Sequence, residues 1–400
     1  MSAEEKTARS VVTIGPFHPL QEEPEHFRLF VDGEIVTKVD IHIGYNHRGI
    51  EKLCESRNWE QIVFLVERIC GICSTSHPIA SVQAMEDCGN IEVPERALYI
   101  RSIIGELERI HSHLLWVGLA GHFIGYNTVF MWAWKWRELI LDICEKTTGN
   151  RNHYAMMKPG GVWRDIKEQD IPWILKQLDA LEPKLHLIAG AVQDDPVLHA
   201  RLKGRGILTP EDIRRYSALG PTARGSGVAI DVRKDHPYAA YGKVDWKVVT
   251  HPTCDIYAKA MVRVLECFES IKIIRQCLQK MPKGEIDSKP TSIPAGEGEG
   301  HHEAPRGETF HYCRSDGSNR PARYKARAPT FMNLPTDFTA VVGESITDAA
   351  LALAAIDPCY CCTERAGVFH YRTGELLYGG KDLLRLSHEK TARLRKEIGK

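Results

Sequence analysis

The alternation of apolar and polar residues near the amino terminus predicts a β-hairpin. Residues 27–44 read FRLFVDGEIVTKVDIHIG, with two runs of β-branched side chains on either side of Asp32-Gly33. An Asp-Gly pair suits the positive φ angles of a tight turn, and alternating runs of this length suit half-buried strands. We therefore expect a small β-rich region within residues 1–50.

Beyond Glu51 the apolar positions change to the period of a helix. After Pro94, residues of one helical face recur at intervals of three and four: Ile100, Ile103, Ile104, Leu107, His111 and Leu114. A second such stretch covers residues 260–278, and Pro282 and Gly284 close it. The pattern predicts a mainly α protein of the α+β class, with a helical core over residues 51–365. The sequence shows no internal repeat.

Two segments, residues 114–134 and 287–307, differ in composition from the rest of this helical region. Residues 114–134 contain no Lys, Arg, Asp or Glu and are long enough to cross a bilayer, but three glycines, His122 and Asn127 interrupt them. We expect a buried helix or a broken pair of helices there, and a protein that is not itself integral to a membrane. Residues 287–307 are rich in Pro, Gly and Glu, which predicts an irregular segment, either a linker or a loop of a site.

Composition narrows the class of function. The 400 residues carry 52 basic and 52 acidic side chains, so a polyanion-binding surface is not indicated and nucleic acid is an unexpected partner. The first ten residues, MSAEEKTARS, lack the apolar core of a signal peptide, which indicates a reducing compartment for the 12 cysteines. Close-spaced cysteines in such a compartment indicate metal or redox chemistry more often than disulfides.

Two cysteine motifs stand apart from the other thiols. RICGIC supplies Cys70 and Cys73, and DPCYCC supplies Cys359 and Cys362, with Cys361 between them. A gap of two residues lets both sulfurs of a pair turn toward one metal, and four soft ligands suit zinc, an iron-sulfur cluster or a thiolate-bound nickel site. A separation of nearly 290 residues disfavours a compact zinc ribbon, although the spacing alone leaves structural zinc open.

The residues that flank the motifs carry a resemblance. Arg48, Gly49 and Glu51 precede Glu67-Arg68 and the first cysteine pair in an RGxE…ERxCGxC arrangement, and DPCYCCTER forms the second motif. Paired in this order, they resemble the two signatures of nickel-iron hydrogenase large subunits. Further segments, GPFHP, GPTARGSG, EAPRGE and DGSNRPARYKARAP, resemble the group 4 membrane-bound, energy-converting hydrogenases and the related quinone-site large subunit of respiratory complex I. The complex I subunit typically lacks the four thiolates, so the chain is identified with the hydrogenase branch.

The resemblance implies a reaction and a set of site residues. Cys70, Cys73, Cys359 and Cys362 would bind nickel, and two of them, Cys73 and Cys362, would bridge to an iron that carries CO and cyanide. Such a Ni-Fe(CO)(CN)2 centre would interconvert H2 with protons and electrons.

Four further residues match positions around that centre. Glu51 matches the proton-transfer glutamate, Arg306 matches the arginine that lies over the diatomic iron ligands, and Asp357 matches an acidic residue beside the site. His77 would hydrogen-bond a bridging sulfur if residues 73–77 are helical. The open alternatives are a surface glutamate paired with Lys52 or Arg48, a surface ion pair for the arginine, a helix-capping aspartate, and a core histidine.

Four features remain outside this set. His18 occupies the position where the complex I relative contacts quinone, and we expect a structural role for it; Cys361 is expected to be a buried bystander. The 35 residues after Arg365 resemble an extension that a maturation endopeptidase removes, although Leu383, Leu384, Leu386 and Leu394 also suit an amphipathic helix. Glu364-Arg365 stands where the common signature ends in histidine, which puts an additional magnesium or iron site in doubt.

The resemblance also implies partners. No other cysteine spacing suits an iron-sulfur cluster, so electrons would pass to a small subunit with 4Fe-4S clusters, docked beside Cys70 and Cys359. Integral membrane subunits would anchor the complex at the cytoplasmic face of the cell membrane and pump ions. The alternatives are a complex I-like subunit without nickel-iron chemistry and a structural zinc protein.

Overall fold

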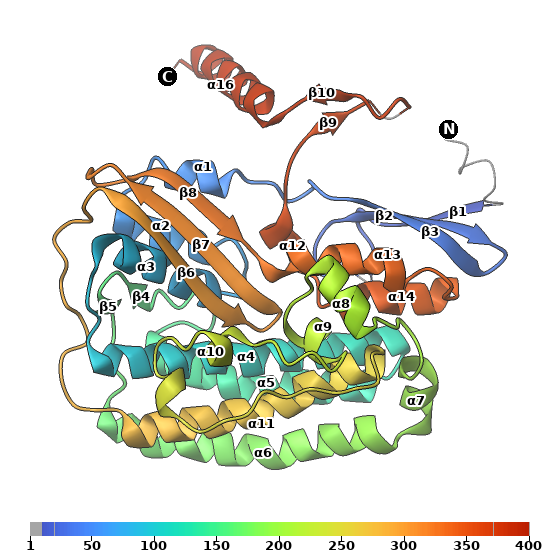
Figure 1. Cartoon of the computed structure of the whole chain (residues 1–400), viewed down its shortest axis with the longest axis horizontal. Coiled ribbons are helices and arrows are strands. Elements are labelled where there is room, and N and C mark those ends of the chain that lie inside the picture. Colours follow the sequence, from blue (N-terminus) through green and yellow to red (C-terminus); the bar gives the residue numbers. More distant parts are fainter. Residues whose placement is uncertain (1–9, 20, 371, 400) are drawn as a thin grey trace.

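Four long helices form one side of the molecule, and two three-stranded antiparallel sheets lie on the other (Figure 1). The computed structural model describes residues 10–19, 21–370 and 372–399. The expectation about a signal peptide therefore falls largely on residues 1–9, which lie outside the described residues. The α+β class is confirmed.

The amino-terminal sheet contains the expected hairpin. Strands β1 (Ser10–Ile14), β2 (His26–Asp32) and β3 (Ile35–His42) pair in that order, each antiparallel to the next. The turn between β2 and β3 is formed by Gly33 and Glu34, one residue later than the Asp-Gly pair suggested, with Gly33 at a φ of 62°. Only a residue that tolerates a positive φ fits there without strain.

The helical layer consists of α4 (Glu95–Ile124), α5 (Asn127–Thr148), α6 (Ile171–Asp194) and α11 (Ile256–Lys280). The uncharged segment at residues 114–134 is a broken pair of helices, as expected: α4 ends at Gly125, whose φ of 89° terminates it, and α5 begins two residues later. Within the described ranges, no helix is long and apolar enough to cross a membrane.

The prediction that residues 287–307 are irregular was wrong. Strand β6 (Gly296–Ala304) lies within them and pairs with β7 (Gly307–Ser315), which pairs with β8 (Pro321–Arg327). Glycines at positions 298 and 300 let β6 lie directly on helix α3 (Ser76–Gly89), because a Cβ at Gly300 would stand only 2.1 Å from the carbonyl oxygen of Ala80. The glycines therefore allow a strand to pack closely on a helix. The chain has a second sheet that the sequence did not predict.

Short elements connect these layers. They are α1 (Ile50–Cys54), α2 (Trp59–Glu67), β4 (Met157–Lys158), β5 (Gly161–Val162), α7 (Pro196–Leu202), α8 (Pro210–Tyr216), α9 (Gly220–Arg224), α10 (Val232–Asp235), α12 (Pro329–Asn333), α13 (Asp337–Ala340), α14 (Ile346–Ala355) and α15 (Tyr360–Thr363). The tail after Arg365 forms β9 (Val368–Phe369), β10 (Leu376–Tyr378) and α16 (Gly380–Glu397), which extend away from the body (Figure 1). No residue of α16 is buried, so this helix forms without packing on the rest of the chain.

Candidate metal centre

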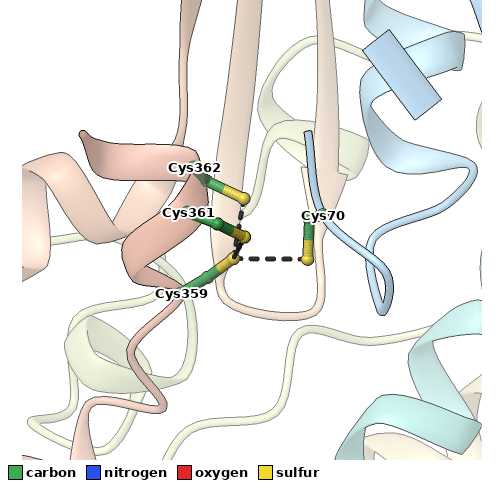
Figure 2. A group of neighbouring side chains, drawn as sticks. All are labelled: Cys70, Cys359, Cys361 and Cys362. Carbon is green, nitrogen blue, oxygen red and sulfur yellow. Dashed lines mark hydrogen bonds between the residues drawn. The ribbon is translucent and has the colours of Figure 1, made fainter. Parts of the chain in front are cut away.

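The two cysteine motifs meet although nearly the whole chain separates them. Cys70 and Cys73 lie in the turn between α2 and α3, and the backbone N–H groups of Ile72 and Cys73 donate to Cys70 Sγ at 3.4 and 3.2 Å. Cys359 directly precedes α15, which carries Cys362. Cys359 Sγ lies 3.2 Å from Cys70 Sγ and 2.7 Å from Cys362 Sγ (Figure 2).

The fourth sulfur of this group is that of Cys361, and the predicted ligand Cys73 is not among the four. The sulfur of Cys361 lies 3.6 Å from that of Cys359, and the sulfurs of Cys70, Cys359, Cys361 and Cys362 are all within 4.8 Å of one another. Cys361 is only half-buried, whereas the other three are buried. Sequence reasoning treated Cys361 as a bystander, but its thiol shares the cluster, with Glu23 as a neighbour at 2.6 Å from Cys361 Sγ.

The electrostatics of the cluster favour a soft cation. Thiol donors, Cys359 foremost, lower the pKa of Cys70 well below its ordinary value, so this sulfur is the first to ionise. Burial raises the pKa of Cys362 well above its ordinary value, and the neighbouring Cys70 sulfur does the same for Cys73. Several adjacent thiolates in a buried site need a bound metal to balance their charge, and sulfur ligands suit nickel, iron or zinc.

Arg306 and Asp357 lie beside the sulfurs. Arg306, in the turn between β6 and β7, directs Nη1 to within 3.6 Å of Cys73 Sγ and Nη2 to within 2.7 Å of Asp357 Oδ1. Both side chains are almost completely buried, and Arg263 approaches the second oxygen of Asp357 at 3.8 Å. A buried arginine paired in this way presents positive charge to the sulfurs at a fixed position.

His77 is in contact with the second motif. It lies in the first turn of α3, and its Nε2 is 3.4 Å from Cys362 Sγ. The contact is to one of the two sulfurs expected to bridge the metals, and burial lowers the pKa of His77 to about 4. The ring is therefore neutral near pH 7, with a single N–H.

Glu51 lies on α1 with its carboxylate directed to strand β8. It accepts a hydrogen bond from the backbone N–H of Ala326 at 3.0 Å and pairs with Lys325 at 3.0 Å and Arg365 at 3.6 Å. Within the part of the chain that the structure describes, no hydrogen bond joins Glu51 to a cysteine. Its ion-pair partners are Lys325 of β8 and Arg365, just after α15, rather than the neighbouring Lys52 or Arg48.

Arg48 connects the two motifs. Its guanidinium donates to the carbonyl oxygens of Arg68 and Ile69, both at 2.7 Å, and to that of Cys361 at 3.1 Å. The RGxE segment therefore contributes an arginine that holds the backbone of the first motif against that of the second.

Three acidic side chains near the cluster were missed by sequence reasoning. The loop between β1 and β2 brings Glu22 to within 4.0 Å of Arg306 and Glu23 to Cys361, whose backbone N–H donates to Glu23 at 2.7 Å. Glu108 of α4 accepts from the backbone N–H groups of Thr75 and Ser76 just after the first motif. Burial raises the pKa values of both Glu22 and Glu108 to about 8.

The signal for these residues was weak. Glu22 and Glu23 stand in QEEPE, an acidic loop with a proline that is typical of solvated surface, and Glu108 is one of several charges on an otherwise apolar helix. His18 lies in the same loop as Glu22 and Glu23, ahead of them in the chain.

Two family profiles match the chain. The profile of the respiratory-chain NADH dehydrogenase 49 Kd subunit matches residues 124–293 and 288–365, and that of nickel-dependent hydrogenase matches residues 48–118. The chain is 40% identical over 404 residues to membrane-bound hydrogenase subunit alpha of Pyrococcus furiosus, covering 97% of this chain and 94% of that protein. It is 42% identical over 356 residues to the carbon monoxide-induced hydrogenase of Rhodospirillum rubrum, covering 88% of this chain and 99% of that protein.

A solved structure has the same fold. A chain in the membrane-bound sulfane sulfur reductase, an archaeal respiratory membrane complex, superposes with a TM-score of 0.85. The two chains are 29% identical, and the match covers 89% of this chain and 98% of the other.

Proposed function

The chain belongs to the family that includes the large subunits of membrane-bound hydrogenases and the 49 kDa subunit of respiratory-chain NADH dehydrogenase. From this we propose that it is the catalytic subunit of a membrane-bound nickel-iron hydrogenase. The reaction is the reversible formation of H2 from two protons and two electrons. The chain is thus an oxidoreductase.

One observation carries the proposal. The sulfurs of Cys70, Cys359 and Cys362 come together in a buried cluster, and the buried Arg306 lies beside the sulfur of Cys73. A Ni-Fe(CO)(CN)2 centre held by these four cysteines would supply the heterolytic cleavage of H2. The donor set fits such a centre because it is all sulfur, is closed to solvent and has a compensating cation beside it.

The surrounding residues have separate roles in this proposal. Arg306, held by Asp357, would present positive charge to the diatomic ligands of the iron when the centre is bound. His77 donates a hydrogen bond to the sulfur of Cys362 and tunes its basicity. Glu51 carries protons between the site and solvent; its side chain is 27% exposed and stands within reach of Arg365, three residues beyond Cys362.

The proposal includes partners and a location. Electrons leave through an iron-sulfur small subunit with 4Fe-4S clusters, docked beside Cys70 and Cys359, because the described part of the chain contains one cysteine cluster only. Hydrophilic and integral membrane subunits of a complex I-like assembly hold the chain as a peripheral subunit at the cytoplasmic face of the membrane, where the reaction drives ion translocation. A maturation endopeptidase removes the residues after Arg365.

The test is metal analysis of the purified complex together with its infrared spectrum. We expect one nickel per chain and the stretching bands of CO and cyanide. Zinc as the only metal would favour a structural zinc protein, and a chain without metal would favour a redox-silent, complex I-like subunit. Either result would contradict the proposal.

A further inference from the structure

A chain of hydrogen bonds leads away from Cys362 through the interior. His77 Nε2 lies 3.4 Å from Cys362 Sγ, and His77 Nδ1 lies 3.0 Å from Nε2 of His311 on β7. His311 Nδ1 lies 2.6 Å from the hydroxyl of Tyr324 on β8, which donates to Ser81 Oγ on α3 at 2.6 Å. All four side chains are fully or almost fully buried.

Each hydrogen bond in this series contains a single hydrogen atom. His77 Nδ1 and His311 Nε2 face each other at 3.0 Å and share one hydrogen, so one of these two nitrogens carries the N–H and the other is bare. The hydrogen on one ring nitrogen therefore determines the role of the next. Because Tyr324 donates to Ser81 here, it accepts from His311 Nδ1–H, and His311 Nε2 accepts from His77 Nδ1–H.

The direction of the chain depends on the state of Cys362. With a thiol at Cys362, the S–H group donates to the bare Nε2 of His77, which agrees with the direction given above. A metal-bound thiolate can only accept, so Nε2 of His77 must then carry the hydrogen and His311 must donate to His77 Nδ1. In that state the Tyr324 hydroxyl donates to His311, and Ser81 is the remaining partner of Tyr324.

We propose that His311 and Tyr324 are positioning residues that set the tautomer and orientation of His77, so that its Nε2–H donates to the Cys362 sulfur in the metal-loaded protein. The inference rests on the proposed function, since it concerns Cys362 as a metal ligand. A ring held at both nitrogens cannot rotate or change tautomer without breaking a bond in the interior. Sequence reasoning identified His77 alone, because His311 and Tyr324 lie more than 230 residues away in the sheet that it did not predict.

The test compares infrared spectra of the loaded complex with Tyr324→Phe and His311→Leu variants. A hydrogen bond withdraws electron density from a thiolate, so its loss makes the iron more electron-rich and shifts the CO band to lower wavenumber. We expect this shift in both variants at unchanged nickel content. His311→Gln, whose amide can still donate to His77 Nδ1, is expected to return the band toward the wild-type position.

Tyr241→Phe is the matched control, because it removes another fully buried hydroxyl, one that donates to Glu106 at 2.7 Å. Its CO band should coincide with that of the wild type. Wild-type CO bands in both Tyr324→Phe and His311→Leu would overturn the inference. Equal shifts in His311→Leu and His311→Gln would also overturn it, because the shift would then come from changed packing and not from a lost hydrogen bond. A wild-type complex without CO and cyanide bands would instead contradict the proposed function itself.

Discussion

Arg306 holds Asp357 at two points. Its Nη2 lies 2.7 Å from the carboxylate, and its Nε donates to the backbone carbonyl of the same residue at 2.7 Å. Asp357 has a φ of 58°, in the left-handed region that aspartate tolerates better than most residues, and it stands two residues before Cys359. Because the same guanidinium reaches Cys73, one side chain sets the second motif against the first.

Replacing Arg306 by lysine should therefore impair catalysis more than metal binding. A lysine ammonium cannot reproduce the planar two-point contact with Asp357. We expect the rate of H2 evolution per nickel to fall by roughly 100-fold, as for loss of one preorganised donor. Arg327→Lys is the matched control: Arg327 holds Glu308 through its carbonyl at 2.7 Å and its carboxylate at 2.5 Å, at the sheet's more exposed edge. A wild-type rate per nickel in Arg306→Lys would remove Arg306 from the site's chemistry.

Glu51→Gln should suppress isotope exchange between H2 and D+ while leaving the nickel content intact. The amide keeps the size of the side chain and the acceptor for Ala326 N–H, but it cannot take up a proton. Glu55→Gln is the control, because Glu55 follows the same short helix and pairs with Lys52 and Arg323 as Glu51 pairs with Lys325. Full exchange activity in Glu51→Gln would exclude this carboxylate from the proton route.

Gly300→Ala should destabilise the fold. The added Cβ would stand 2.1 Å from the carbonyl oxygen of Ala80 and 2.5 Å from the backbone nitrogen of Ala84, so β6 would have to move off α3. We expect a loss of at least about 2 kcal/mol in the free energy of unfolding, measured by denaturant titration. Gly296→Ala on the same strand should be tolerated, because its Cβ would meet nothing closer than 3.4 Å. Equal stability of the two variants would contradict the close packing.

The sequence predicts the long helices well, because helical periodicity is a local signal. Its two cysteine motifs do meet, but the fourth sulfur that clusters with Cys70, Cys359 and Cys362 is that of Cys361 and not that of Cys73. The sequence does not predict β6, because glycines chosen for close approach to α3 have the composition of a loop. Glu23 was equally hidden: an acidic loop residue is usually solvated, and only the fold brings it to Cys361. Contacts between distant segments, such as His77 with His311, have no counterpart in any local pattern.

Removing the residues after Arg365 should leave the stability of the body unchanged. Helix α16 buries no residue, and the side chains of β9 and β10 are exposed. A chain that ends at Arg365 should therefore have the same thermal midpoint as the full chain when both lack metal. Mass spectrometry of the mature, active protein should give the mass of the shorter chain. A lower midpoint for the shorter chain would mean that the tail is part of the fold, and an active chain that ends at Lys400 would contradict removal.

Glu106, in the middle of α4, should make stability depend on pH in the acid range. Its carboxylate is fully buried and accepts hydrogen bonds from Ser270 at 2.6 Å and Tyr241 at 2.7 Å, and it pairs with Arg233 at 2.9 Å and Arg109 at 3.2 Å. Burial alone would raise its pKa, but the two arginines prevail and lower it to about 2.

A carboxylate whose pKa is lower in the folded than in the unfolded state stabilises the fold above its unfolded pKa, and this stabilisation is lost as the pH falls toward its folded pKa. For Glu106 the window runs from 4.5 down to about 2, and the corresponding free energy is about 3 kcal/mol. Glu106→Gln should therefore lower the free energy of unfolding at pH 7 and flatten its decline between these pH values. Glu95→Gln, at the exposed start of the same helix, loses only a surface pair with Lys243 and should change the free energy of unfolding by less than about 1 kcal/mol. If denaturant titrations give Glu106→Gln and the wild type the same decline in the free energy of unfolding between these pH values, the arginines do not keep this carboxylate ionised. The buried charge network around Glu106 would then contribute to stability through packing and not through charge.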